Sequence, residues 1–177
     1  MTMISSTFPS EAARLVAKIS SDEFHLDDHL HMVKPQPKIL KCFQGLTGAY
    51  QAIGDKFSRF QNMQLTGDLS EADLSLVTCD PLQPSLPEGN SVIMVNEAAR
   101  TGKALRGRIV AKRHPLMNGV NWQTLQARES TQLQLTENDE ILLWQGTRPL
   151  IALRTSVSTP GAEDGVPKRI YQLIFNF

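Results

Sequence analysis

The sequence predicts an α/β fold with a mostly parallel sheet and an antiparallel hairpin added near its C-terminal end. Short, nearly continuous apolar runs at residues 74–78, 91–97 and 107–115 are bounded by turn residues. Such runs are typical of parallel strands that are buried on both faces. An amphipathic helix between residues 46 and 60 separates strands, as α/β connections do. Residues 140–154 hold two apolar runs around a glycine, which indicates a hairpin.

The expected elements follow one another in a regular order. Strands are expected at residues 14–20, 29–35, 36–43, 62–67, 74–78, 91–97, 107–115 and 169–177, with the hairpin turning at Gly146. One helix is predicted by apolar residues that recur every three or four positions, namely Leu46, Ala49, Tyr50, Ile53, Phe57 and Phe60. We expect this stripe to pack in the core. Residues 130–135 alternate polar and apolar side chains, and residues 81–90 and 158–168 are loops rich in proline or glycine.

Length and composition favour one domain with an N-terminal appendage. The chain has 177 residues, of which 41% are hydrophobic and 20% are charged, so it can bury a sizeable core. We expect an N-terminal arm with lead-in strands at residues 1–35 and the α/β domain at residues 36–177. Because the last strand runs to Phe177 without a polar stop, we expect the domain to be truncated at its C-terminus.

Nothing in the sequence indicates membrane insertion or secretion. No apolar run approaches the roughly 20 residues that span a bilayer. Residues 1–16 lack a basic region followed by a continuous apolar run, so no signal peptide is visible. Cys42 and Cys79 are too few for a disulfide framework. The chain as given is therefore expected in the cytoplasm, without direct membrane insertion and without a cofactor.

Charge is divided unevenly along the chain. Residues 1–97 hold twelve acidic and seven basic side chains, and residues 98–177 hold six acidic and eleven basic ones. No acid lies between Glu97 and Glu129, where the bases are Arg100, Lys103, Arg106, Arg108, Lys112, Arg113 and Arg128. A basic stretch can bind phosphate or nucleic acid. Because no aromatic residue interleaves with these bases before Trp122, we expect a solvated face and no nucleic-acid partner.

Histidines and aspartates are concentrated in the stretch HLDDHLH at residues 25–31. In a strand, His29 and His31 share one face and could bind zinc together with His25. No second cluster of cysteine or histidine follows to complete such a site. We therefore expect no metal there, and an exposed strand whose polar side chains block pairing with other chains.

A second group of candidate residues lies where predicted strands end. Ligands of open α/β sheets bind at the carboxyl ends of the strands, so Thr78, Cys79, Asn96 and His114 are the candidate ligand-binding residues. Cys79, His114 and Glu97 could form a nucleophile, base and acid. However, Asp80 next to Cys79 opposes the thiolate, and the small residues of a nucleophile elbow are missing. We therefore expect no catalytic residue, and keep this triad as the alternative.

Several phrases, in order, resemble one family. They are FHLDDHLHMVKPQPKIL, SEADLSLVTCDPLQPSLPEGNSVIMVN, HPLMNGVNW, DEILLWQGTRPLIALR and YQLIFNF. Together they are similar to the C-terminal part of bacterial membrane-anchored proteins of the von Willebrand factor A, aerotolerance (Bat-like) type. HPLMNGV also resembles a turn of the amidotransferase-like trehalose-utilisation family. The resemblance covers about residues 22–177 and implies a three-layer, flavodoxin-like sandwich of the class I glutamine amidotransferase type.

The resemblance also implies a function. The chain lacks the metal-binding Asp-x-Ser-x-Ser loop of a von Willebrand A domain and the Gly-x-Cys-x-Gly elbow of an amidotransferase. We therefore expect a non-catalytic interaction or scaffold module of a larger envelope-associated protein, which would place it in the periplasm as part of a membrane-anchored chain. Two alternatives remain open: a cysteine hydrolase or amidotransferase that uses Cys79, and a domain that senses a small ligand or anion.

Overall fold

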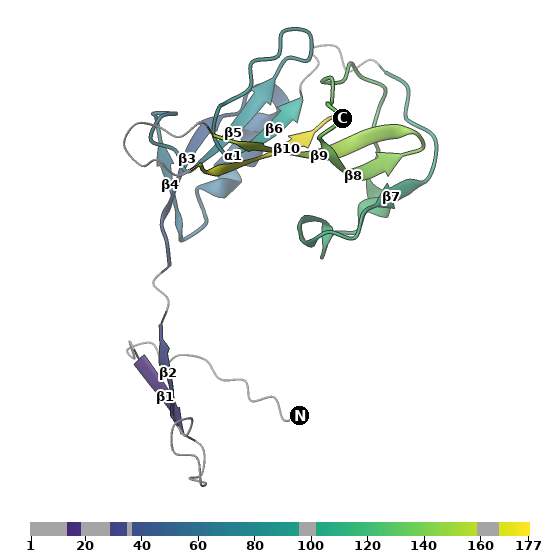
Figure 1. Cartoon of the computed structure of the whole chain (residues 1–177). Coiled ribbons are helices and arrows are strands. Elements are labelled where there is room, and N and C mark those ends of the chain that lie inside the picture. The colour runs from purple at the N-terminus through teal and green to yellow at the C-terminus, as the bar shows by residue number, and fades with distance from the viewer. Residues whose placement is uncertain (1–13, 19–28, 35–36, 96–101, 159–166) are drawn as a thin grey trace. The chain divides into compact units, whose positions relative to one another are not determined.

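A computed structural model describes residues 14–18, 29–34, 37–95, 102–158 and 167–177 (Figure 1). The chain divides into two compact units, Met1–Lys38 and Ile39–Phe177. None of the helices in the described ranges has the length and apolar character needed to span a bilayer.

Unit 1 contains an antiparallel pair of strands, β1 (Arg14–Lys18) and β2 (His29–Val33). Both strands were predicted from the sequence. Leu15 faces Met32 and Ala17 faces Leu30, so that one face of the pair is apolar. An isolated two-stranded hairpin is marginally stable in water.

Unit 2 is built on one eight-stranded sheet with the strand order β4-β3-β5-β6-β10-β9-β8-β7. The strands are β3 (Leu40–Gly45), β4 (Met63–Thr66), β5 (Leu74–Cys79), β6 (Ser91–Val95), β7 (Ile109–Ala111), β8 (Glu140–Gln145), β9 (Arg148–Val157) and β10 (Arg169–Phe175). The strands from β4 to β10 in this order are mutually parallel. β9, β8 and β7 continue the sheet with antiparallel pairing. The predicted mostly parallel sheet and the hairpin at Gly146 are thus confirmed.

Helix is scarce among the residues that the structure describes. α1 (Gln51–Phe57) follows the 3₁₀ turn η1 (Gly48–Tyr50), and two further 3₁₀ turns are η2 (Pro115–Met117) and η3 (Trp122–Thr124). Within the described ranges α1 is the only α-helix. The structure therefore supports a mixed α/β fold, whereas helix layers on both faces of the sheet are not seen in these ranges.

The observed helix is shorter than the predicted one and is rotated about its axis. Tyr50 is buried as expected, but Ile53 is 37% exposed and Phe60 is 60% exposed. Gly54 is the buried residue of α1, and an added Cβ there would lie 2.0 Å from the Gln44 side-chain nitrogen. The Gln44 side chain of β3 therefore lies directly against Gly54, while part of the predicted apolar stripe lies towards solvent.

The two faces of the parallel strands are covered in different ways. On one face α1 and η1 pack over Cys42, Leu76 and Met94. On the other face Leu133 packs with Cys79, Ile93, Val95, Ala152 and Ile174. Leu133 belongs to the irregular segment 130–136, here called the strap segment. Its alternating pattern therefore reflects a chain that inserts apolar side chains into the core without forming a strand.

Candidate functional site at the carboxyl ends of the parallel strands

The parallel strands β3, β5, β6 and β10 all end at the same side of the sheet. After β3 the chain passes through α1 to β4, which lies on one side of β3 in the sheet, whereas after β5 it passes to β6, which lies in the opposite direction along the sheet. The two connections therefore diverge between β3 and β5. Ligands of open α/β sheets bind outside the carboxyl ends near such a divergence. Between β3 and β5 the gap is bridged by a 2.7 Å hydrogen bond between the hydroxyls of Thr47 and Thr78.

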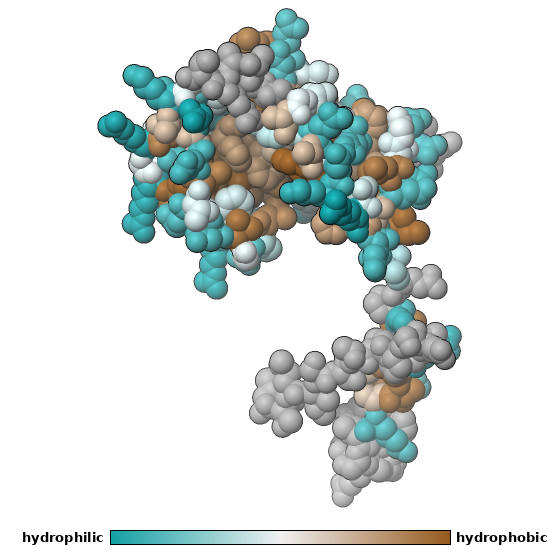
Figure 2. Space-filling model, turned by 180° about the vertical axis from the view of Figure 1, so that it is seen from behind, coloured by the Kyte–Doolittle hydropathy of each residue, from teal (hydrophilic) through white to brown (hydrophobic). Residues whose placement is uncertain are grey.

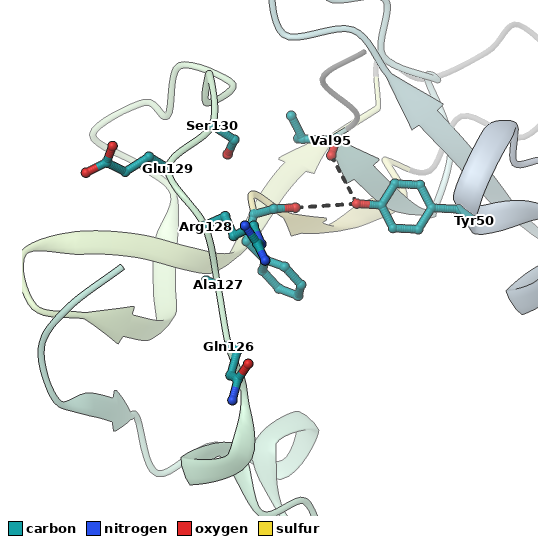
Figure 3. A pocket seen from close by; sticks show the side chains of 8 residues that line it. Tyr50, Val95, Gln126, Ala127, Arg128, Glu129 and Ser130 are labelled. Atoms are coloured by element: carbon teal, nitrogen blue, oxygen red, sulfur yellow. Dashed lines mark hydrogen bonds between the residues drawn. The ribbon is translucent and has the colours of Figure 1, made fainter. Parts of the chain in front are cut away.

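A cavity of about 260 Å³ lies close by, at the ends of β6 and β10 (Figure 3). It is called the carboxyl-end cavity here. Its lining consists of Tyr50, Val95, Gln126, Ala127, Arg128, Glu129, Ser130 and Phe177. Tyr50 belongs to η1, Val95 ends β6, and Phe177 lies two residues beyond β10. The segment before the strap supplies most of the others. The cavity is thus assembled from parts of the chain that are distant in sequence.

Tyr50 is the central polar side chain of this cavity. Gly48 adopts a φ of 59°, which glycine tolerates best, and this lets the chain turn sharply after β3. The turn places the Tyr50 ring against the sheet with 7% of the residue exposed. Its hydroxyl donates to the carbonyl oxygens of Val95 and Phe177, each at 3.4 Å. Tyr50 therefore ties the ends of β6 and β10 together.

Residues 126–130 form the opposite wall and are held in an extended conformation. Leu105 N donates to Ala127 O at 2.9 Å, and Glu129 N donates to Lys103 O at 2.8 Å. Side chains alternate along such a segment. Figure 3 shows Arg128 directed towards the strand ends and Glu129 directed away from them.

Two contacts fix the position of this wall. An added Cβ on Gly102 would lie 1.7 Å from Glu129 O, so the two backbones touch and only glycine fits there. The Arg148 guanidinium donates to Ser130 O and, at 2.8 Å, to Ser130 Oγ. The wall is therefore attached to β9 and also to the neighbouring segment at residues 102–105.

Besides the acidic Glu129, the lining of the cavity holds one basic side chain, Arg128. Its guanidinium donates to Gly102 O at 3.4 Å. No salt bridge joins it to a carboxylate in the part of the chain that the structure describes. An arginine is charged at all ordinary pH values, so the cavity carries a positive group on one side.

Cys79 does not line the carboxyl-end cavity. Its side chain lies in the core under the strap segment, and the residue is 3% exposed. Burial raises the pKa of the Cys79 thiol; a backbone hydrogen bond from Ser85 lowers it, and the charge of Asp80 raises it further. The thiol is therefore protonated at neutral pH, whereas a nucleophile must be a thiolate.

The expected convergence of Thr78, Asn96 and His114 was wrong for His114. His114 follows β7, and four strands, β6, β10, β9 and β8, lie between β5 and β7. β7 also runs opposite to β5, so that its carboxyl end lies at the other side of the sheet. The His114 ring instead accepts a 3.2 Å hydrogen bond from Leu116 N at the start of η2. Asn96 and Glu97 lie outside the described residues.

The histidine stretch is only partly described. His25 lies outside the described residues. His29 and His31 lie two positions apart in β2, opposite Lys18 and Val16 of β1. No group of three metal-ligating side chains is found in the described ranges. The expectation that no metal binds there stays a prediction.

A second surface of note lies beside the helix. A pocket of about 200 Å³ between α1 and the sheet is lined only by apolar residues, namely Leu46, Ile53, Phe57, Leu76, Val92, Met94 and Phe175. We call it the α1 groove. Figure 2 shows apolar side chains gathered in a hollow on one face of unit 2. Sequence reasoning did not find this groove, because the predicted stripe was expected to pack completely.

The wall residues of the carboxyl-end cavity were also missed. Residues 126–130 have no apolar periodicity, and Arg128 was counted only as one base of a solvated stretch. The rule that ligands bind at strand ends pointed to the side of the sheet where this cavity lies, but the segment across the cavity, residues 126–130, had no signal of its own. Comparison with family models, curated proteins and solved structures finds no match to this chain.

Proposed function

We propose that the chain is a non-catalytic interaction module of a larger envelope-associated protein. The observation that carries this proposal is the α1 groove, an apolar pocket left beside a helix of seven residues. Apolar surface of this kind marks interaction sites. The resemblance to the C-terminal domain of Bat-like proteins supports the same role. On this proposal the ancestral fold is the flavodoxin-like, amidotransferase-type sandwich, and a partner covers the α1 groove.

A non-catalytic role is further supported by the state of the candidate nucleophile. Cys79 is buried, its pKa is raised, and His114 lies across the sheet. Alkylation of intact protein by iodoacetamide should therefore be slow at Cys79, because the thiol stays protonated at pH values below the ordinary thiol pKa of about 8.5. Mass spectrometry of peptides would measure it. Fast modification at neutral pH would favour the hydrolase alternative.

The partner that fits the groove is a segment with apolar side chains flanked by acidic residues. The groove has no polar lining, and a volume of about 150 Å³ already accommodates a benzene ring in an engineered cavity. Lys56 and Arg59 lie on or just after α1. The structure records no salt bridge for either among the described residues. Their free positive charges favour an acidic flank.

A fluorescent amphipathic peptide of leucine and glutamate would test the groove. Fluorescence anisotropy should show saturable binding to the chain. Ile53→Asp places a charge on the wall of the groove and should weaken binding about tenfold, or 1.4 kcal/mol. Val110 on β7 is 50% exposed and lies outside the groove, so Val110→Asp is the matched control. Equal binding by both variants would contradict the proposed surface.

The setting of the module follows from the same proposal. As part of a membrane-anchored protein it would lie in the periplasm, and as a free chain in the cytoplasm. Its partner would be another protein or the remainder of the larger one.

A further inference from the structure

We propose that the carboxyl-end cavity is a binding site for a small monocarboxylate with an apolar body, and that Arg128 recognises the carboxylate. This site is separate from the α1 groove and does not depend on the proposed interaction function. Its volume of about 260 Å³ is below the range of about 300–1,000 Å³ that is usual for drug-sized ligands. A compact ligand is therefore expected.

The walls of the cavity supply both apolar surface and polar groups for such a ligand. Val95, Ala127 and Phe177 provide apolar surface, and Ala127 is 3% exposed. Arg128, Ser130 and Tyr50 provide polar groups around it. A cavity that is mainly apolar with a few convergent polar groups is the usual form of a small-molecule site.

The sign and size of the ligand's charge follow from the side chains present. Arg128 has one long hydrogen bond to Gly102 O and no salt bridge to a carboxylate among the described residues. A guanidinium presents parallel N–H donors that match a carboxylate. Glu129 is directed away from the strand ends in Figure 3. The lining holds one cationic side chain, Arg128, and one acidic side chain, Glu129, so a monoanion suits the cavity better than a multiply charged phosphate.

The position in the fold agrees with this assignment. Val95 ends β6, and Phe177 lies two residues beyond the end of β10. The carboxyl ends of parallel strands are where open α/β sheets bind ligands, whether or not they catalyse a reaction. The Tyr50 hydroxyl that joins these two strand ends lines the same cavity. Binding there would therefore stabilise the junction of β6 and β10.

Benzoate, benzamide and inorganic phosphate are the probes that separate the parts of this proposal. Benzoate carries the charge and the apolar body, benzamide lacks the charge, and phosphate lacks the body. Calorimetric titration of the full chain should detect benzoate and give at least about tenfold weaker binding for the other two. If benzamide bound as tightly as benzoate, the proposed role of the ligand's charge would be wrong. If phosphate bound as tightly as benzoate, the proposed need for an apolar body would be wrong.

Variants of the chain assign the site to Arg128. Arg128→Gln should weaken benzoate binding at least about tenfold, and Arg128→Lys should fall in between, because lysine keeps the charge and loses the paired donors. Arg113 is an exposed arginine outside the cavity, so Arg113→Gln should bind like the wild type. Unchanged thermal unfolding would verify that each variant is folded. Equal weakening by Arg113→Gln, or none by Arg128→Gln, would refute the site.

Discussion

The two faces of the parallel strands show how one sheet can be covered in different ways. On the strap face, irregular segments are fastened by polar side chains: Asn176 bonds to Leu133, Gln172 bonds to Pro87, and Arg154 bonds to Asp139. On the α1 face, a short helix packs by apolar contact and leaves a groove. The strap face therefore has specific, directional attachments, whereas the α1 face has adaptable apolar surface. We infer that the strap face serves stability and the α1 face serves binding.

The largest effect is expected on the strap face, at the ion pair of Asp139 and Arg154. The two groups form paired hydrogen bonds of 2.8 and 2.7 Å, and the Asp139 side chain is fully buried, with 0% exposed. Asp139→Ala leaves the guanidinium without its partner and should lower the free energy of unfolding by about 3 kcal/mol. Urea denaturation would measure it.

A matched control comes from a surface ion pair. Lys41 and Glu71 lie 3.0 Å apart and are about half exposed, at 47% and 58%. Glu71→Ala should cost less than about 1 kcal/mol. If both variants lost the same stability, the strap face would not depend on its buried attachment.

The same pair gives the stability a defined pH dependence. Burial alone would raise the pKa of Asp139, but hydrogen bonds from Arg154 and from the Thr136 N–H hold the pKa below its usual value. A carboxylate with a lowered folded pKa stabilises above its unfolded pKa of about 3.9, and this stability is lost as the pH falls through the folded value. Urea midpoints between pH 6 and 2 should fall for the wild type. They should fall less for Asp139→Asn, and parallel curves would contradict the assignment.

The next largest loss of stability is expected when the side chain of Asn176 is replaced. Its side chain accepts from Leu133 N at 2.8 Å and donates to Leu133 O at 3.1 Å, and the residue is 1% exposed. Asn176→Ala leaves two buried backbone groups without partners and should cost about 2 kcal/mol. Asn176→Leu restores volume but no hydrogen bond, so it should not recover the loss. A leucine variant as stable as the wild type would show that packing alone holds the strap segment.

Most of the strands could be predicted from the sequence, because an apolar run bounded by turn residues indicates a strand whichever strands it later pairs with. The order of the strands in the sheet, and the direction of β7, could not be predicted. β10 (Arg169–Phe175) inserts between β6 and β9, and nothing in its side-chain pattern encodes these partners. The expected meeting of Cys79 and His114 failed for the same reason, since it assumed that β7 was parallel and close to β5.

The candidate site was predictable only in outline. The rule for strand ends pointed to the side of the sheet where the carboxyl-end cavity lies, but Thr78 and Cys79 are not among the residues that line it. Arg128 and Tyr50 were given other roles, as part of a solvated basic stretch and of a core stripe. Their meeting depends on Gly48 and Gly102, which allow a sharp turn and a close backbone contact. The sequence alone does not show which turn or close contact a given glycine permits.

On the α1 face, Phe57 should contribute less than a core phenylalanine. It is half-buried and lines the groove, so that Phe57→Ala should cost about 1–2 kcal/mol, compared with about 3–5 kcal/mol for a fully buried ring. Leu76 forms part of the groove's lining and is 1% exposed. Leu76→Ala should therefore cost more than Phe57→Ala. The reverse order in urea denaturation would mean that α1 packs more tightly than the groove indicates.

The smallest expected effect tests why α1 is rotated. Alanine normally favours a helix interior over glycine by about 1 kcal/mol, but a Cβ on Gly54 would meet the Gln44 side chain at 2.0 Å. Gly54→Ala alone should therefore destabilise slightly, because Gln44 must move. In a Gln44→Ala background the same substitution should stabilise by up to about 1 kcal/mol, and the change of sign appears as coupling in a double-mutant cycle. Equal effects of Gly54→Ala in both backgrounds would exclude Gln44 as the residue that fixes the helix rotation and thereby exposes the groove.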